Sequence, residues 1–289
     1  MSQAFPLVIA GGNSLIAPFL MERLRTKGIT AEVISRREVD VPEGFKFTHL
    51  DFTMSRNWIA PENAIIISLL PFTLLAQFLP RFIGIKSMIS VGTASRFMKA
   101  HSHNPKEQAN AIKIKLAEDM IQNWSIRSNV NSTLLRGALI YDGKSDYNIV
   151  RMARFIKRYR FLPLAAPANG LRQPIHADDV AKAIVACLDN AAVYGKDLNI
   201  AGGETLTYRA MAERIFLALG MKPRLWMLET GVFKKGFEWV SNSHLIQDSF
   251  FSTAVFQRMN EDLIFDASEG LTLLNYQPRG FNPKIQITE

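Results

Sequence analysis

The sequence predicts an α/β fold, a doubly wound parallel sheet with a smaller C-terminal domain. Short apolar runs of strand length alternate with longer helical stretches over the first half of the chain. A glycine-containing turn, residues 11–17, joins the first run to the first helical stretch, and the alternation stops after Tyr141. We expect a dinucleotide-binding domain over 1–202, of which 146–174 contributes to the substrate cleft, and a smaller substrate-binding domain over 203–289.

Each element of this fold is expected from a local pattern. Apolar or alternating runs predict strands over 6–10, 30–35, 45–52, 64–70, 87–92 and 131–140. Helical periodicity predicts helices over 15–28, 71–82 and 104–124. After Tyr141 the expected elements are a basic helix over 148–160, a loop over 163–174, a helix over 179–191, a strand over 197–202 and a helix within 203–220 that Thr207 caps. The aromatic-rich remainder is expected to be less regular.

Composition limits the function classes. The chain has 289 residues, of which 48% are hydrophobic and 21% charged, so we expect a globular protein and not a disordered one. The single cysteine, Cys187, excludes an internal disulfide, is expected in the core and fits a reducing cytoplasm. No secretory signal is expected at the N-terminus, and no unbroken apolar run of spanning length occurs there.

The net charge of +8 favours anionic small molecules such as nucleotides. The basic residues are scattered and no aromatic–basic recognition motif is present, so we expect no nucleic-acid partner.

The turn at residues 11–17, GGNSLIA, has the spacing of a phosphate-binding loop. In such loops one glycine allows the turn, a second lets a pyrophosphate approach, and a third lets helix and strand pack closely. Gly11 holds the first position, whereas Ser14 and Ala17 replace the other two. The Ser14 hydroxyl can still donate to a phosphate. The expected contacts come from Gly11, Asn13, Ser14, Leu15 and Ile16; the alternative is a plain strand–helix turn.

The next strand ends predict which dinucleotide is bound. The second strand ends in Ser35, Arg36 and Arg37, where an NAD site usually has a carboxylate for the ribose hydroxyls. Arginine suits a 2′-phosphate, so we expect NADP(H) in preference to NAD(H). The alternative is that both arginines are solvated loop charges. Asp51 either meets the adenine amine or caps its loop. Further expected cofactor contacts are Phe52, Ser68, Leu69 and Leu70.

Several segments together resemble the extended or atypical short-chain dehydrogenase/reductase superfamily, of the NAD-dependent epimerase/dehydratase type. The resemblance covers nearly the whole chain. The segments that carry it are GGNSLIA (11–17), HLDF (49–52), SVGTASRF (90–97), LLRGALIYDG (134–143), LRQPIHADDVAKAI (171–184), LNIAGGETLTYRAMAERI (198–215) and LNYQPRGF (274–281).

The resemblance implies a catalytic Tyr-x-x-x-Lys motif assisted by a Ser or Thr. The tyrosine exchanges a proton with the substrate, and the lysine lowers its pKa and contacts the ribose. The matching stretch is AIKIK, residues 111–115, so Lys115 matches the lysine while Ala111 stands in place of the tyrosine. Glu118 matches a common glutamate, and Thr93 is the best match for the Ser or Thr. Alanine cannot transfer a proton, so this departure leaves the chemistry in question.

Three side chains are candidate substitutes for the missing proton donor. His101 and His103 precede the helix that carries Lys115, and histidine titrates in the useful range. Tyr141 leaves the sixth strand. Their alternative roles are solvated loop residues for the histidines and wall packing for the tyrosine. Lys113 is expected on the solvent face of the helix.

Two further features have competing interpretations. His176 near Asp178 and Asp179 suggests metal or acid–base chemistry, but a helix cap is the stronger interpretation, and no spacing supports zinc. The aromatic segment 226–256 can line an apolar pocket, form a subunit contact, touch a membrane or pack the core of the small domain.

The combined interpretation is a cytoplasmic NADP(H)-binding protein, an oxidoreductase or nucleotide-sugar epimerase/dehydratase-like enzyme with a non-standard site. Its expected partner is a small-molecule substrate, which can be anionic or linked to a nucleotide. A homodimer is also possible. The main alternative is a non-catalytic protein that holds NADPH as a structural or sensing group. The superfamily that the sequence resembles includes such proteins, among them an accessory subunit of respiratory complex I. A scaffold without any cofactor follows if Ser14 blocks the phosphate.

Overall fold

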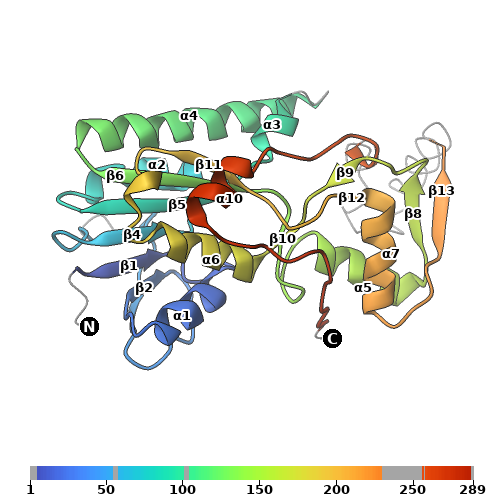
Figure 1. Cartoon of the computed structure of the whole chain (residues 1–289), viewed down its shortest axis with the longest axis horizontal. Coiled ribbons are helices and arrows are strands. Elements are labelled where there is room, and N and C mark those ends of the chain that lie inside the picture. Colours follow the sequence, from blue (N-terminus) through green and yellow to red (C-terminus); the bar gives the residue numbers. More distant parts are fainter. Residues whose placement is uncertain (1–4, 55–57, 101–103, 230–255, 257, 288–289) are drawn as a thin grey trace. The chain divides into compact units, whose positions relative to one another are not determined.

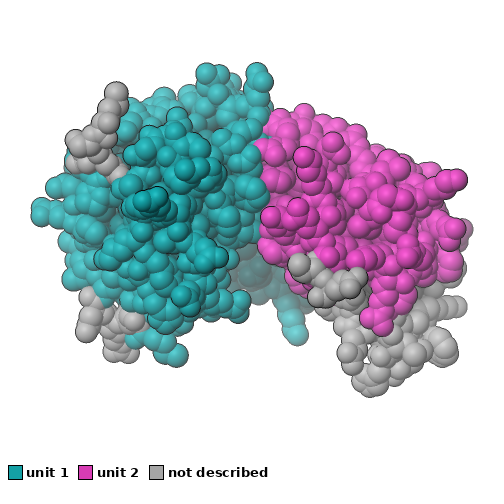
Figure 2. Space-filling model, turned by 90° about the horizontal axis from the view of Figure 1, so that it is seen from below, with its two compact units in different colours: residues 1–137, 177–200, 265–277 teal, residues 138–176, 201–264, 278–289 magenta. Residues whose placement is uncertain are grey.

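A computed structural model describes residues 5–54, 58–100, 104–229, 256 and 258–287. The chain forms two compact units, each built from three segments (Figure 2). The first unit comprises residues 1–137, 177–200 and 265–277, and the second comprises 138–176, 201–264 and 278–289. The units therefore interleave along the chain, whereas the predicted division has a single boundary between residues 202 and 203.

The first unit contains a seven-stranded sheet with the order β11-β6-β5-β4-β1-β2-β3, in which every neighbouring pair is parallel. The strands are β1 (Leu7–Ala10), β2 (Glu32–Ser35), β3 (Lys46–His49), β4 (Ile65–Ser68), β5 (Ser87–Thr93), β6 (Asn131–Gly137) and β11 (Asp197–Ile200). Every residue of β1 and β4 is buried, as expected of central strands covered on both faces. β3, at one edge, is partly exposed throughout.

Helices cover both faces of this sheet (Figure 1). They are α1 (Ala17–Thr26), α2 (Phe72–Phe78), α3 (Arg96–Lys99), α4 (Pro105–Arg127), α6 (Ala177–Cys187) and α10 (Ser268–Leu274), with short 3₁₀ turns η1 (Leu79–Arg81) and η2 (Ala191–Val193). On one face α2 packs against α4, and on the other α1 packs against α6. The arrangement confirms the predicted doubly wound parallel sheet. None of the helices in the described part of the chain is long and apolar enough to cross a bilayer.

In its described residues, the second unit has two helices and three short two-stranded ladders. The helices are α5 (Ile149–Tyr159) and α7 (Tyr208–Ala218). The ladders are β7 (Ile140–Tyr141) with β10 (Ile175–His176), β8 (Leu162–Ala165) with β13 (Leu225–Leu228), and β9 (Leu171–Arg172) with β12 (Leu206–Thr207). Apolar side chains of α5, α7 and β8 form a single core together with Tyr141, Phe256 and Phe281.

Local expectations fail in two places. The predicted loop over 163–174 contains most of β8 and all of β9, because tertiary pairing with later segments recruits residues of low strand propensity such as Pro163. The helix predicted from Asp179 begins at Ala177, so Asp178 and Asp179 lie inside its first turn and do not precede it. The Thr207 cap is confirmed, since its Oγ1 accepts from the Ala210 amide at 3.1 Å.

Candidate functional site

A pocket of about 380 Å³ lies in the first unit, where β1, β2, β3 and β4 end. This is the side of a parallel doubly wound sheet on which ligands bind, and the volume lies in the range of small-molecule sites. The predicted cofactor residues that line it are Gly11, Asn13, Ser14, Leu15, Ser35, Arg36, Asp51, Phe52, Leu69 and Leu70. Five further lining residues were not predicted from the sequence. The only feature that could have indicated them is that they lie at or near the ends of the predicted strands; they are Ile34, Leu50, Thr53, Pro71 and Leu74.

The glycine turn holds the backbone close to its neighbours. Gly11 has a φ of 98°, and a Cβ built on Gly12 would meet Val33 Cγ1 at 2.6 Å, so a side chain at either position would disturb the turn. The amides of both glycines donate to the Ile34 carbonyl at 2.9 and 3.0 Å. The turn then leads into α1, whose N-terminal amides favour an anion.

Ser14 has a defined role in this turn. Its hydroxyl oxygen accepts from the Ile16 amide at 3.3 Å, and its backbone carbonyl accepts from Ala17 at 3.0 Å. A hydroxyl that accepts one bond keeps its own hydrogen as a donor. Ser14 lines the pocket, so its hydroxyl can contribute to binding a phosphate.

Arg36 and Asp51 place opposite charges in the same pocket. Asp51 Oδ1 accepts from Thr53 Oγ1 at 2.6 Å and from Thr53 N at 2.8 Å. These hydrogen bonds, with a smaller contribution from the charge of Arg36, hold the pKa of Asp51 below its usual value. Asp51 therefore stays a carboxylate at neutral pH, able to accept from an amine, and at the same time it caps its own loop.

Some predicted cofactor residues lie outside the pocket lining. Arg37 is exposed, and its amide donates to Ser35 Oγ at 3.2 Å. Ser68 is fully buried, with its hydroxyl accepting from the Leu70 amide at 3.4 Å. Ile16 is buried at the start of α1. Contact of Ser68 and Ile16 with a cofactor stays a prediction, whereas the exposure of Arg37 favours the alternative of a solvated loop charge.

Thr93 ends β5 with an exposed side chain. Its Oγ1 accepts from the Ser95 amide at 3.1 Å, which fixes the turn between β5 and α3. The hydroxyl therefore lies at the carboxyl edge of the sheet, the position expected of a substrate-orienting group.

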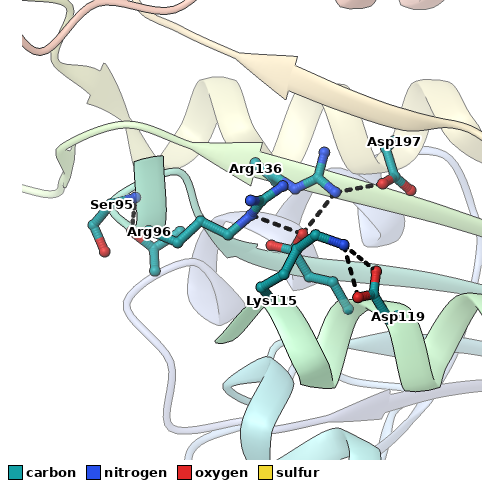
Figure 3. Close-up of polar contacts among 8 residues, drawn as sticks. Ser95, Arg96, Lys115, Asp119, Arg136 and Asp197 are labelled. Carbon is teal, nitrogen blue, oxygen red and sulfur yellow. Dashed lines mark hydrogen bonds and ion pairs between the residues drawn. The ribbon is translucent and has the colours of Figure 1, made fainter. Parts of the chain in front are cut away.

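Lys115 of α4 pairs with Asp119, one turn further along the same helix (Figure 3). Its Nζ donates to Asp119 Oδ1 at 2.5 Å and Oδ2 at 2.7 Å, and both side chains are substantially exposed. Ala111, one turn earlier, is only 4% exposed. The helix thus carries an ion-paired lysine and a buried alanine where the resemblance implies a lysine and tyrosine acting together.

A buried charge network lies beside these residues (Figure 3). Glu118 Oε2 is 2.9 Å from Arg96 Nε and accepts from Arg136 Nη2 at 2.8 Å, and Arg136 also donates to Asp197. Burial tends to lower the pKa of Arg136, but the two carboxylates outweigh it and raise that pKa. The network joins α3, α4, β6 and β11. Apart from Glu118, sequence reasoning missed it, since its members are far apart in the chain.

Two of the candidate proton donors lie outside the described residues, namely His101 and His103. The third, Tyr141, is only 1% exposed in the core of the second unit, with edge-on ring contacts to His176 and Phe281. This location fits the packing alternative better than proton transfer to a bound substrate.

The remaining candidates have structural roles. Asp178 pairs with Arg23 at 2.6 Å and Asp179 with Lys182 at 2.8 Å. Within the described part of the chain, no group of three or more His, Cys, Asp or Glu residues could hold a metal. Cys187 is buried, and burial raises the pKa of its thiol to about 12.

The aromatic segment is described only at its two ends. Trp226 is 57% exposed and Phe256 is buried in the core of the second unit. Its other aromatic residues, Phe233, Phe237, Trp239, Phe250 and Phe251, lie outside the described residues.

Comparison with known proteins gives fold-level matches over the whole chain and one local sequence match. No family model matches. A segment of 94 residues is 33% identical to the NADH dehydrogenase [ubiquinone] 1 alpha subcomplex subunit 9, mitochondrial, of Arabidopsis thaliana, and covers 32% of this chain and 23% of that protein.

Solved structures of sugar-nucleotide epimerases share the fold. UDP-glucuronic acid 4-epimerase from Bacillus cereus, in complex with UDP-glucuronic acid and NAD, has a TM-score of 0.71 at 13% identity over 96% of each chain. UDP-glucose 4-epimerase from Thermotoga maritima, with UDP-glucose, has 0.66 at 14% identity over 97% of this chain and 96% of that one. UDP-N-acetylglucosamine 4-epimerase from Bacillus cereus has 0.65 at 17% identity over the same shares. The fold of this chain is that of these UDP-sugar 4-epimerases.

Proposed function

We propose that this protein binds a nicotinamide dinucleotide, NADP(H) in preference to NAD(H), in the pocket at the ends of β1 to β4. The observation that carries the proposal is that one pocket gathers the glycine turn, Arg36 and Asp51. The turn and the start of α1 supply amides for a pyrophosphate, and Asp51 supplies a carboxylate for the adenine amine.

The preference for NADP(H) rests on Arg36. The end of β2 carries Ser35 and Arg36 where a carboxylate would be needed to accept from both ribose hydroxyls. A guanidinium binds a 2′-phosphate through charge-assisted hydrogen bonds. The epimerase from Bacillus cereus was solved with NAD, so the preference is proposed from this chain's own residues.

The dinucleotide is proposed to serve as a structural or sensing group. Ala111 has no proton to exchange, and Lys115 is paired with Asp119 on an exposed helix face. The local sequence match is to a protein named as one subunit of NADH dehydrogenase [ubiquinone], which supports a role as part of a larger assembly.

The second candidate function is an oxidoreductase or nucleotide-sugar epimerase with a substitute acid. Its support is the exposed Thr93 at the end of β5 and the fold shared with the UDP-sugar 4-epimerases. Its substrate would be a small nucleotide-linked molecule.

Two measurements on the purified protein test the proposal. Fluorescence titration with NADPH and NADH is expected to give tighter binding of NADPH, and failure to bind either nucleotide would refute dinucleotide binding. Equal affinities would refute the preference alone. Reduction of a carbonyl or epimerisation of a UDP-sugar near a typical enzyme rate of about 10 s⁻¹ would favour the second candidate.

A further inference from the structure

Helix α5 of the second unit exposes a row of cations. Arg154, Lys157 and Arg158 are exposed, and Arg160 continues the row just past the last turn. The opposite side of the helix is apolar and packs into the core of the unit. No Asp or Glu occurs in the sequence between Asp146 and Asp178, so the helix contains no carboxylate to neutralise the row.

Helix stability does not account for this charge pattern. Cations in the last turn, such as Lys157 and Arg158, interact favourably with the helix dipole, but Arg151 lies in the first turn, where a cation is unfavourable. Arg154 and Arg158 are also four residues apart, a like-charge spacing that destabilises a helix. Helix stability therefore accounts for Lys157 and Arg158 in the last turn but not for Arg151 or for the spacing of Arg154 and Arg158, and binding of an external anion would account for these.

Aromatic side chains lie beside the cations. Tyr159 ends α5, is 36% exposed and contacts Phe155 at 4.5 Å between ring centroids. Trp226 of β13 is 57% exposed and stacks on Phe161 at 4.0 Å. One ring face of Trp226 is therefore fixed by the protein while the rest of the side chain meets solvent. Tyrosine and tryptophan with this partial exposure are typical of contacts at the boundary between water and lipid.

A cavity of about 460 Å³ lies at the C-terminal end of the same helix. Among the described residues, the charged ones that line it are Lys157 and Arg160, and its walls include Leu219, Met221 and Ile287. Arg160 Nη1 lies 3.7 Å from Met221 Sδ. Two cations beside apolar walls match a molecule with an anionic head and an apolar body.

We propose that the basic face of α5 (Arg151, Arg154, Lys157, Arg158 and Arg160) binds the surface of an anionic phospholipid bilayer, with one headgroup between Lys157 and Arg160. Clusters of four to eight cations on an amphipathic helix bind anionic lipid, and each cation near the surface strengthens binding about fivefold. The apolar walls of the cavity beside Lys157 and Arg160 favour a ligand with an anionic head and an apolar body, which is the make-up of a phospholipid. Exposed aromatic side chains beside cations also bind single-stranded RNA by stacking, so RNA is included in the test below. Every residue invoked belongs to the second unit, whereas the dinucleotide pocket lies in the first.

Vesicle cosedimentation of the full chain tests this proposal. Binding is expected to vesicles containing phosphatidylglycerol, not to pure phosphatidylcholine, and to weaken in high salt. Arg154→Glu with Arg158→Glu should weaken binding by more than about tenfold, and Lys157→Ala by about fivefold. Trp226→Ala should weaken it at unchanged dependence on anionic lipid. The matched control reverses two exposed cations of α4, Lys106→Glu with Lys113→Glu, and should change binding by less than about twofold.

Three outcomes would overturn the proposal. One is equal binding to both vesicle types, and another is an equal loss in the α4 control. The third is tighter binding, at equal salt, to polyglutamate or to single-stranded RNA than to the anionic vesicles. Unchanged thermal unfolding and unchanged NADPH binding of the α5 variant would show that it is folded, and would separate this test from that of the dinucleotide site.

Discussion

Lys115 and Asp119 form an ion pair one turn apart on α4, with Nζ within 2.7 Å of both carboxylate oxygens. The pair is exposed, so its contribution to stability is small, about 0.3–0.5 kcal/mol. If Lys115 binds the ribose, it must leave Asp119 to do so, and the two interactions compete.

That competition predicts opposite effects of the two partners on NADPH affinity. Lys115→Ala should weaken NADPH binding several-fold, and more clearly than it affects any turnover. Asp119→Asn should tighten binding by about twofold, because the lysine no longer has a competing partner. Fluorescence titration measures both, and an Asp119→Asn variant that binds more weakly would contradict the competition.

The two arginines after β2 should differ in their effects on cofactor choice. Arg36 lines the pocket and Arg37 does not. Arg36→Ala should weaken NADPH binding by about tenfold or more while leaving NADH nearly unchanged, since the lost bond is to a charged phosphate. Arg37→Ala removes the same charge and is the matched control, with an expected change below about twofold. Equal losses for NADPH and NADH in the Arg36→Ala protein would count against a 2′-phosphate contact.

The buried carboxylate of Glu118 should be essential to the first unit. It is 1% exposed and lies within 3 Å of a nitrogen of each of two arginines. Glu118→Gln leaves these buried cations with less compensating charge and should lower the free energy of unfolding by about 3–5 kcal/mol. Urea denaturation measures the loss. Asp119→Asn, on the next residue but exposed, should cost less than about 1 kcal/mol, and similar values for the two would argue against the network.

Introducing the tyrosine that the resemblance implies at position 111 should fail to restore activity. Ala111 is 4% exposed, so the ring of Ala111→Tyr must displace its neighbours at a cost of about 1–3 kcal/mol. We expect a lower melting temperature and no gain in carbonyl reduction. Ala111→Ser, which adds one atom, is the control and should retain most of the stability. A stable tyrosine variant that reduces carbonyls would instead show that the site is intact apart from this residue.

Cys187 should make stability fall in alkaline solution. Burial raises the pKa of its thiol from 9.0 to about 12. The folded protein therefore keeps the proton while the unfolded chain releases it, so this contribution is complete below pH 9 and is lost as the pH rises from 9 towards 12. The free energy of unfolding should fall by at most about 1.4 kcal/mol per pH unit because of this thiol. Urea denaturation of the wild type and of Cys187→Ala at several pH values should show the steeper decline in the wild type.

The sequence predicts the sheet well because its strands follow local rules. β1 and β4 are continuous apolar runs, and Gly11 follows β1 where the turn needs a positive φ. The pocket lining follows equally from the ends of successive parallel strands, which meet at one edge. These features depend on short segments and on one topological rule.

Long-range pairings could not be predicted in this way. β8 pairs with β13 some 60 residues later in the chain. Pro163 and Trp226 are partners in this pairing, and nothing in the sequence near either residue indicates the other. The charge network could not be predicted either. In the sequence nothing distinguishes its members from other charged residues, and they carry a desolvation penalty only because the fold brings them together in a largely buried place; they are Arg96, Glu118, Arg136 and Asp197. The ion pair of Lys115 also depends on a side-chain geometry that the family motif does not encode.

The interleaving of the two units has a consequence for synthesis on the ribosome. Residues 265–277 belong to the first unit, where Gly270 packs so closely that a Cβ would be 2.6 Å from the Asn199 carbonyl oxygen. A nascent chain that has emerged only to residue 202 has every strand of the main sheet but lacks this covering segment. Neither unit can be completed until the residues after 264 have been translated, so an early stalled product would expose an unfinished sheet to chaperones and proteases.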